Sequence, residues 1–222
     1  IYSYSPAPPA TQPAGATGLD PGDTRLLYAF WRSGALTTGQ TTACATGHAC
    51  AGIIQLNVSG YPSISTVQAW ALQAAGTDYF YPSVAANSAG DMSMVYSKSS
   101  ATQFVGAYQI GIPNPGCTMC FDFETLVQSG LNTYVLTFPP DPRNRWGDYF
   151  AASPDPNGTG IWVEGESASA TANQWATGIQ LTYPLPSQLL VPYTPVTGGV
   201  PGTFAHDYQI TTSEQSHWNV VG

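Results

Sequence analysis

The feature that most constrains the fold is a series of short apolar and aromatic runs between Asp23 and Tyr183, each ended by Gly, Pro, Asn or Ser. Runs of this kind are typical of β-strands. Nothing in this region recurs at helical spacing over ten residues, so the sequence predicts an all-β fold. The predicted strands are 25–32, 52–58, 65–74, 81–86, 91–97, 104–110, 133–137, 148–152, 161–166 and 176–183.

Two segments, 79–110 and 145–182, resemble each other. Each reads as a strand, a tight turn, a second strand, a short Ser/Ala/Thr loop and a third strand, and the turns are Asn87-Ser88-Ala89-Gly90 and Asp155-Pro156-Asn157-Gly158. A repeated unit of this type is typical of a propeller blade. Similar hairpins also occur in sandwiches. We therefore expect β-propeller-type blades, in a partial or small propeller, with a β-sandwich as the alternative.

Proline-rich segments flank the strand region. Residues 1–22 are rich in Pro, Ala, Gly and Thr and carry almost no charge, which predicts an extended arm or linker. Residues 23–183 form the predicted domain, and residues 184–222 form a Pro-rich segment that packs on the domain or on a partner. The alternative is that both ends complete the sheet of a neighbour, which would give self-assembly or pairing with a second chain.

Charge is scarce in this chain. Charged residues make up 8% of the sequence, and 5 basic against 13 acidic side chains give a net charge of -8. Five scattered cations cannot neutralise a phosphate track, which argues against nucleic acid as a partner. No apolar run approaches the ~18 residues that a membrane-spanning helix needs. Sparse charge with an acidic balance fits an extracellular setting.

The four cysteines fall into two close pairs, Cys44 with Cys50 and Cys117 with Cys120. In a secreted chain, each pair reads as a local disulfide. A zinc site formed by both pairs and His48 is the alternative. A thioredoxin-like role for Cys117 and Cys120 is disfavoured because the flanking sequence predicts no helix.

The strings GDTRLLYAFWRSG, DYFYPSVAANSAGDMSMVYSKSS, NRWGDYFAASPDPNGTGIWVEGE and NQWATGI resemble a family of secreted bacterial β-propeller modules related to the sialidase-like superfamily. The resemblance covers residues 22–183, and RWGDY is its most specific element. It implies a propeller architecture and a secreted or cell-surface location. Most members have no assigned activity, so it implies architecture more than chemistry. A complete propeller of this kind needs more sequence than is present here.

Sialidase-type chemistry would need an arginine cluster, a Tyr–Glu pair and a separate Asp. The arginines are Arg25, Arg32, Arg143 and Arg145, and the candidate catalytic residues are Asp148, Glu164, Glu166, Arg145 and Tyr149. Alternation along a strand puts Glu164 and Glu166 on one face, as a general acid/base pair, a cation ligand or a solvated face. Arg145, Trp146 and Asp148 are candidate ligand-binding residues at the entrance of a central channel. The alternative for this segment is a structural lock, in which Arg145 pairs with Asp148 and Trp146 packs between blades.

Cofactors are not expected, apart from a calcium ion held by Asp122 and Glu124 together with Asp91 or Asp141. The residues 153–158 resemble a degenerate Asp-box, a structural turn at the outer rim of a blade. No G-x-S-x-G motif is present, which argues against a serine hydrolase. The expected function is therefore a non-catalytic binding or structural module of an extracellular protein, with a glycan as ligand. The alternative is a carboxylate-based glycoside hydrolase of sialidase-like architecture.

Overall fold

The computed structural model describes residues 4–113 and 121–184. These residues form antiparallel β-sheets with no α-helix, which confirms the predicted all-β class. A single 3-10 turn occurs at Pro13–Gly15. The strands are β1 (Phe30–Arg32), β2 (Ala35–Ala43), β3 (Ala49–Asn57), β4 (Ser65–Leu72), β5 (Thr77–Ala86), β6 (Met92–Ser100), β7 (Gln103–Ile112), β8 (Thr125–Gln128), β9 (Thr137–Phe138), β10 (Asp141–Asn144), β11 (Ala151–Pro154), β12 (Ile161–Ala168) and β13 (Trp175–Thr182).

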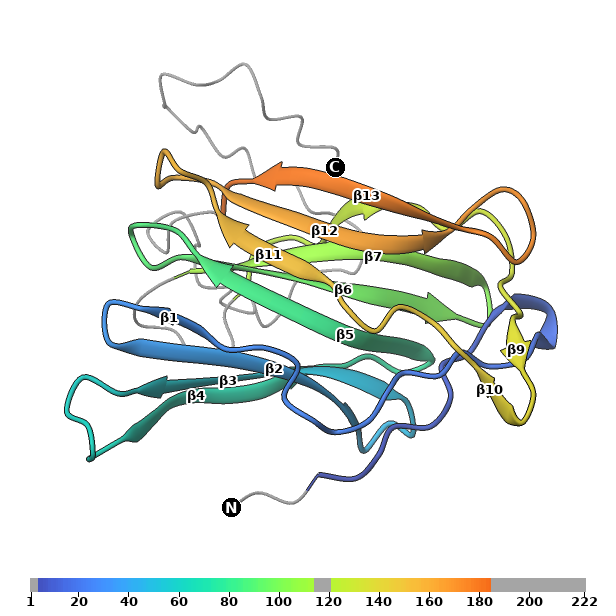
Figure 1. Cartoon of the computed structure of the whole chain (residues 1–222), viewed down its shortest axis with the longest axis horizontal. Helices are drawn as coiled ribbons and strands as arrows, with labels where there is room; N and C mark the ends of the chain where they lie inside the picture. The colour runs from blue at the N-terminus through green and yellow to red at the C-terminus, as the bar shows by residue number, and fades with distance from the viewer. Residues whose placement is uncertain (1–3, 114–120, 185–222) are drawn as a thin grey trace, which may run out of the picture. The chain divides into compact units, whose positions relative to one another are not determined.

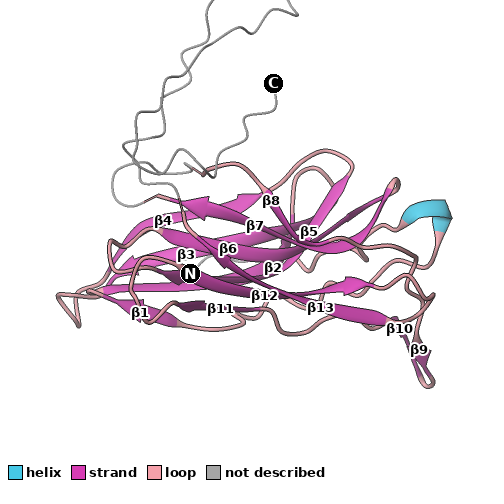
Figure 2. Cartoon of the chain, turned by 90° about the horizontal axis from the view of Figure 1, so that it is seen from above, coloured by secondary structure: helices cyan, strands magenta, loops and turns pink. Residues whose placement is uncertain are grey.

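The strands build three sheets in which each strand pairs with the next one along the chain. We call β1–β4 the first sheet, β5–β8 the middle sheet and β11–β13 the third sheet, while β9 and β10 form a separate hairpin. Figure 1 shows the three sheets in layers, with the middle sheet between the other two. Figure 2 shows that strands and loops make up the described chain apart from one short helical turn. The described sheets do not close into a barrel, and this arrangement is consistent with partial blades or with a sandwich.

Burial follows from this layering. Side chains alternate between the two faces of a strand, so a strand covered on one face shows alternating burial and a strand covered on both faces is buried throughout. Strand β12 alternates over its first half, whereas β5 is buried from Asp78 to Ala86. Met94 and Val95 are adjacent on β6 and both have 0% exposure. Met94 packs in the core shared with the first sheet, and Val95 packs with residues of the third sheet.

Residues 4–22 belong to the packed body of the domain, although the sequence predicts an arm or linker there. Ala10 and Leu19 are fully buried in a core cluster with Phe80 and Trp146. The buried Gln12 side chain donates to the carbonyls of Thr17 and Tyr134 at 2.6 and 2.8 Å and accepts from the Tyr134 N–H at 2.9 Å. These contacts of the Gln12 amide hold a segment of irregular backbone. Its sequence has no periodic pattern of apolar residues, so the packing of this segment on the domain could not be predicted.

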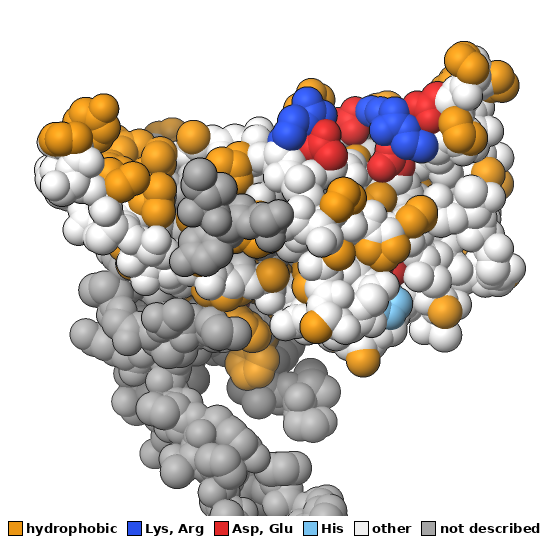
Figure 3. All heavy atoms as spheres, turned by 90° about the horizontal axis from the view of Figure 1, so that it is seen from below, with side chains coloured by type: hydrophobic (Ala, Val, Ile, Leu, Met, Phe, Trp, Pro, Cys, Tyr) orange, Lys and Arg blue, Asp and Glu red, His pale blue; other side chains and the backbone are white. Residues whose placement is uncertain are grey.

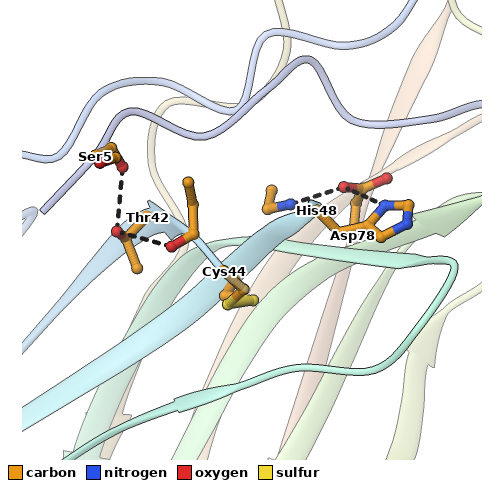
Figure 4. The surroundings of a disulfide bond; sticks show 8 residues. Ser5, Thr42, Cys44, His48 and Asp78 are labelled. Carbon is orange, nitrogen blue, oxygen red and sulfur yellow. Dashed lines mark hydrogen bonds and ion pairs between the residues drawn. A yellow bond between two sulfur atoms is a disulfide. The ribbon is translucent and has the colours of Figure 1, made fainter. Parts of the chain in front are cut away.

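Asp78 on β5 joins three separate parts of the fold. Its carboxylate is fully buried and accepts the backbone N–H groups of Thr11 and Ala49, each at 2.8 Å. The Nδ1 atom of His48 lies 3.2 Å from the same carboxylate (Figure 4). A buried carboxylate requires such donors, because its desolvation is otherwise costly. Asp78 therefore fixes the N-terminal segment and the β2–β3 hairpin to the middle sheet.

The predicted disulfide between Cys44 and Cys50 is confirmed, and it closes the hairpin that carries His48 (Figure 4). Its Cα atoms lie 5.9 Å apart, within the usual range for a disulfide. The alternative of a zinc site that uses these two sulfurs is wrong, because both are bonded to each other. The second pair, Cys117 and Cys120, lies outside the described residues.

The strand predictions hold best where aromatic residues mark the strands. The two similar segments, 79–110 and 145–182, form the antiparallel meanders β5–β7 and β11–β13, so each contains the three strands that the sequence predicts. Strand β2 is missing from the prediction, because its sequence ALTTGQTTA carries neither an aromatic residue nor an apolar run. Strands β8 and β10 are also missing. The predicted strand 133–137 overlaps the structure only at the start of β9.

The two predicted turns lie against each other. Ser88 Oγ donates to the Gly158 carbonyl at 2.6 Å, and Asn87 Nδ2 donates to the Thr159 carbonyl at 3.1 Å. Within the second turn, Asp155 accepts the indole N–H of Trp162 at 2.7 Å. The turn at residues 155–158 therefore has contacts that stabilise the packing of the third sheet on the middle sheet. The Pro-rich segment 184–222 lies outside the described residues from position 185 onward.

We predict that Asp78→Asn lowers the free energy of unfolding by about 2–4 kcal/mol, because an amide nitrogen would face backbone donors in a buried site. The control is Asp23→Asn, which alters an exposed pair with Arg25 and should change stability by less than about 0.5 kcal/mol. Urea denaturation followed by tryptophan fluorescence measures both. Equal effects of the two variants would contradict the role assigned to Asp78.

Candidate functional site

Several predicted residues meet in a surface hollow of about 490 Å³. Its lining comes from the β9–β10 region, from the segment before β11 and from the ends of β12 and β13 that face each other. The lining residues are Tyr134, Phe138, Arg145, Trp146, Gly147, Asp148, Glu166 and Trp175. We call this the acidic hollow. Four of the predicted candidates, Arg145, Trp146, Asp148 and Glu166, are therefore brought together.

Trp146 fixes this hollow to the middle sheet. It is 2% exposed, and its indole Nε1 donates to Ser97 Oγ on β6 at 3.0 Å. The Tyr134 ring packs edge-on against it, with ring centroids 5.0 Å apart. Buried Trp and Tyr usually combine such packing with a hydrogen bond to the polar atom. Trp146 thus packs between layers of the fold, as the structural interpretation of RWGDY predicts. It also lines the hollow.

Arg145 and Asp148 form an ion pair at the surface, with side chains 39% and 38% exposed. The Tyr81 hydroxyl lies 3.3 Å from Asp148 Oδ1 and 3.2 Å from the Asp20 carbonyl. Burial and the nearby Asp148 charge raise the pKa of Tyr81 well above its ordinary value, so this hydroxyl stays protonated and can donate. The Asp148 carboxylate is therefore held by both the Arg145 guanidinium and the Tyr81 hydroxyl, in the lining of the hollow.

The backbone that presents Asp148 is unusual. Gly147 has φ of 56°, and a Cβ atom there would lie 3.1 Å from the Tyr81 ring. Asp148 itself has φ of 105°, which non-glycine residues rarely adopt. Backbone of this kind is held by surrounding contacts and is concentrated at functional sites. The contacts here are the Arg145 ion pair and the packing of Gly147 on Tyr81.

Glu166 has an altered acidity. Burial, followed by the negative charge of Asp148, raises the pKa of Glu166 from 4.5 to about 7, while the Gly147 N–H opposes this shift. Glu164 lies two residues away on the same face of β12, but it is exposed and does not line the hollow. The predicted pair of same-side carboxylates is therefore divided, and only Glu166 shares a site with Asp148.

Three aromatic residues that the sequence does not single out as site residues line the hollow: the buried Tyr134, and the exposed Phe138 and Trp175. Phe138 is 57% exposed and Trp175 is 60% exposed, so both present open ring surface. Trp175 is one of many Tyr and Trp residues for which the sequence predicts core packing in most cases and a sugar-stacking platform in a minority. Tyr149, a predicted catalytic candidate, is 86% exposed and does not line the hollow.

The predicted arginine cluster does not gather at this hollow, because Arg145 alone among the four arginines lines it. Arg25 pairs with Asp23 at 2.7 Å, and Arg143 pairs with Asp20 at 3.1 Å and with Asp141 at 2.6 Å. The hydrogen bonds from Arg143 lower the pKa of Asp141 to about 2. Figure 3 shows acidic and basic side chains in one band at the edge of an otherwise largely uncharged face.

The predicted calcium ligands have protein partners. Glu124 accepts the Tyr96 hydroxyl at 2.8 Å and forms an ion pair with Lys98, and Asp122 accepts the Gly111 N–H. In the part of the chain that the structure describes, no three His, Cys, Asp or Glu side chains are grouped so as to hold a metal ion. Within residues 4–113 and 121–184, no helix has the length and apolar character that crossing a bilayer requires.

Comparisons of the chain with protein-family models, curated proteins and solved structures give no match. The protein is therefore described by its structure alone. It is an all-β protein of stacked antiparallel sheets, with a hollow lined by aromatic, acidic and guanidinium groups.

The raised pKa of Glu166 makes stability depend on pH. The folded state favours the protonated carboxyl, so the stabilisation is complete below about pH 4.5 and is lost as the pH rises through about 7. We predict that Glu166 lowers the free energy of unfolding by about 2 kcal/mol between pH 4.5 and 8, somewhat less than the full shift because the side chain is partly exposed.

Urea denaturation at several pH values measures this dependence. Glu166→Gln should flatten the profile and stabilise the protein at pH 8, whereas the control Glu164→Gln should keep the wild-type profile. Identical profiles for wild type and Glu166→Gln would show that Glu166 is not the group responsible.

Proposed function

We propose that this chain is an extracellular, non-catalytic binding module built from propeller-type blades, and that its acidic hollow binds a carbohydrate. The observation that carries the proposal is the pairing of open aromatic surface, from Phe138 and Trp175, with the polar groups of Arg145, Asp148 and Glu166 in one hollow. Aromatic faces pack on the apolar C–H surfaces of sugar rings, while polar groups at the rim meet the hydroxyl groups.

The Arg145–Asp148 pair suits hydroxyl groups better than a charged ligand. Its guanidinium offers donors and its carboxylate offers acceptors side by side, whereas the opposite charges offset each other. A sugar hydroxyl both donates and accepts, so two neighbouring hydroxyl groups match this arrangement. A volume of about 490 Å³ lies within the usual range of about 300–1,000 Å³ for small-molecule sites.

Other observations support an extracellular propeller module. Three consecutive antiparallel meanders in layers are what neighbouring blades would form. The Cys44–Cys50 disulfide favours an oxidising compartment. The resemblance of 22–183 to secreted bacterial propeller modules agrees with both points.

Assembly with a further sheet is a second part of the proposal. The outer face of the third sheet carries Trp162, Ile179 and Tyr183, which are 43%, 67% and 57% exposed. Exposed apolar side chains that lie together on one sheet face favour contact with another sheet. This supports the expectation that the module is part of a larger or self-assembling surface protein.

We predict that Trp175→Ala weakens the binding of a glycan, selected on a glycan array, at least tenfold in calorimetric titrations, because the stacking surface is lost. The matched control is Trp31→Ala, since Trp31 on β1 is 64% exposed and lies outside the acidic hollow. Equal affinity for Trp175→Ala and wild type, or a similar loss for both variants, would contradict binding in this hollow.

A carboxylate-based glycoside hydrolase is the second candidate, favoured by one observation. Glu166, with its pKa near 7, can be protonated beside Asp148, which is paired with Arg145. A protonated and an ionised carboxyl group flanking one site are the requirement for general acid and base or nucleophile roles. In this mechanism, Glu166 gives its proton to the glycosidic oxygen as the bond to the anomeric carbon breaks. Asp148 accepts a proton from the water molecule whose oxygen bonds to that carbon.

We predict for the hydrolase that Glu166→Gln and Asp148→Asn each reduce turnover at least a hundredfold, because each removes a proton-transfer or nucleophilic group. The control Glu164→Gln should retain full turnover. The assay is release of sugar from a glycan panel, followed by mass spectrometry. Binding without turnover by the wild type would exclude the hydrolase and leave the binding module standing.

A further inference from the structure

A second cavity lies between turns of the first and middle sheets, away from the acidic hollow. Its volume is about 270 Å³. It is lined by the β1–β2 turn, the end of β3 and the β5–β6 turn, and these turns lie at one end of the layers, while β9 and β10 lie at the other (Figure 1). The lining includes Phe30, Arg32, Ser33, Asn57, Ser59 and Val67. We call it the Arg32 cavity.

Arg32 differs from the other cations of this chain. The sequence contains five Lys and Arg residues, and all five are in the described part. Four of them have a carboxylate partner within 4.0 Å: Arg25, Lys98, Arg143 and Arg145. Among the described residues, Arg32 forms no ion pair. In a chain with 13 acidic side chains, a single guanidinium without a carboxylate is a distinctive feature.

The position of the Arg32 guanidinium is fixed by one contact. Its Nη1 donates to the Ala86 carbonyl at 3.0 Å, which joins the end of β1 to the end of β5. A guanidinium carries five N–H donors in a planar fork, so one carbonyl leaves most of them for another acceptor. The natural partner of such a fork is a carboxylate or phosphate that accepts two parallel bonds.

The other lining residues indicate which groups a ligand of this cavity would carry besides the acidic group that binds Arg32. Ser33, Ser59 and Asn57 add hydroxyl and amide groups, while Phe30 and Val67 add apolar surface. A volume of about 270 Å³ is slightly below the range for drug-sized ligands, which limits the ligand to about one sugar unit. The net charge of -8 also favours a ligand with a single negative charge over a doubly charged phosphate.

We propose that the Arg32 cavity binds the carboxylate group of a small hydroxylated molecule of uronic-acid type. The carboxylate accepts from the Arg32 guanidinium, and the hydroxyl groups meet the Ser33, Ser59 and Asn57 side chains. This site is separate from the acidic hollow, so it does not depend on the proposed function.

The test is an NMR titration of wild-type protein labelled with ¹⁵N, in which the side-chain Nε–Hε signals of the four arginines are followed. Glucuronate should shift the Arg32 signal and leave those of Arg25 and Arg143 in place, and neutral glucose should shift the Arg32 signal with at least tenfold weaker affinity, whatever either sugar does to the Arg145 signal in the acidic hollow. Arg32→Gln should reduce glucuronate affinity at least tenfold, whereas Arg25→Gln, which removes an exposed cation elsewhere, should not.

Three outcomes would overturn the proposal. These are an unchanged Arg32 signal in the wild type at saturating glucuronate, equal affinities for glucose and glucuronate as measured by the Arg32 signal, and a response of that signal to inorganic phosphate but not to glucuronate. Because the first readout uses the wild type, it remains decisive if Arg32→Gln destabilises the contact with Ala86.

Discussion

The rest of the structure depends on the burial of the middle sheet on both faces. Met94 and Val95 are neighbours on β6, point to opposite faces and are both fully buried. Neither outer sheet can leave without exposing one of these faces to water, and burial of apolar area is the main source of stability for such a fold. The three layers therefore stabilise one another as a unit.

This layering also positions the acidic hollow. The segment that carries Arg145 and Asp148 is not in a regular strand, and it is held by the Trp146 bond to Ser97 on β6. On its other side, Asn144 donates to the carbonyls of Thr17 and Tyr134, which ties it to the N-terminal segment. Binding residues often lie on irregular segments that a rigid scaffold positions, and here the scaffold is the middle sheet.

The N-terminal segment has an unexpected part in this scaffold. Its Pro-rich composition predicts an arm, but Thr11 donates to the buried Asp78 and Gln12 satisfies the backbone of Tyr134. Such contacts join residues that lie far apart in the sequence, and they follow no local period. For that reason they could not be predicted from the sequence, whereas the aromatic strands and their Asn/Gly turns could.

The same distinction explains which site residues were predictable. RWGDY stands out as a local motif, so Arg145, Trp146 and Asp148 could be singled out. Alternation places Glu164 and Glu166 on one face, but Glu166 alone lines the hollow, where it is partly buried beside Asp148 and the Gly147 N–H, and these are tertiary contacts.

Two omissions have related causes. Phe138 and Trp175 could not be assigned to the hollow, because they come from different parts of the fold. Strand β2 was missed because it buries Thr and Gln side chains rather than the apolar and aromatic residues that marked other strands.

Hydrogen exchange of backbone amides, resolved by residue, tests the layered arrangement most directly. Amides of β6 should exchange only through global unfolding, because both faces of that strand are covered, and the Thr11 amide should be protected as well as an interior strand amide. Amides of β4 and β13, at the edges of the outer sheets, should exchange faster through local opening. Faster exchange in β6 than in β4 and β13, or an unprotected Thr11 amide, would contradict the account.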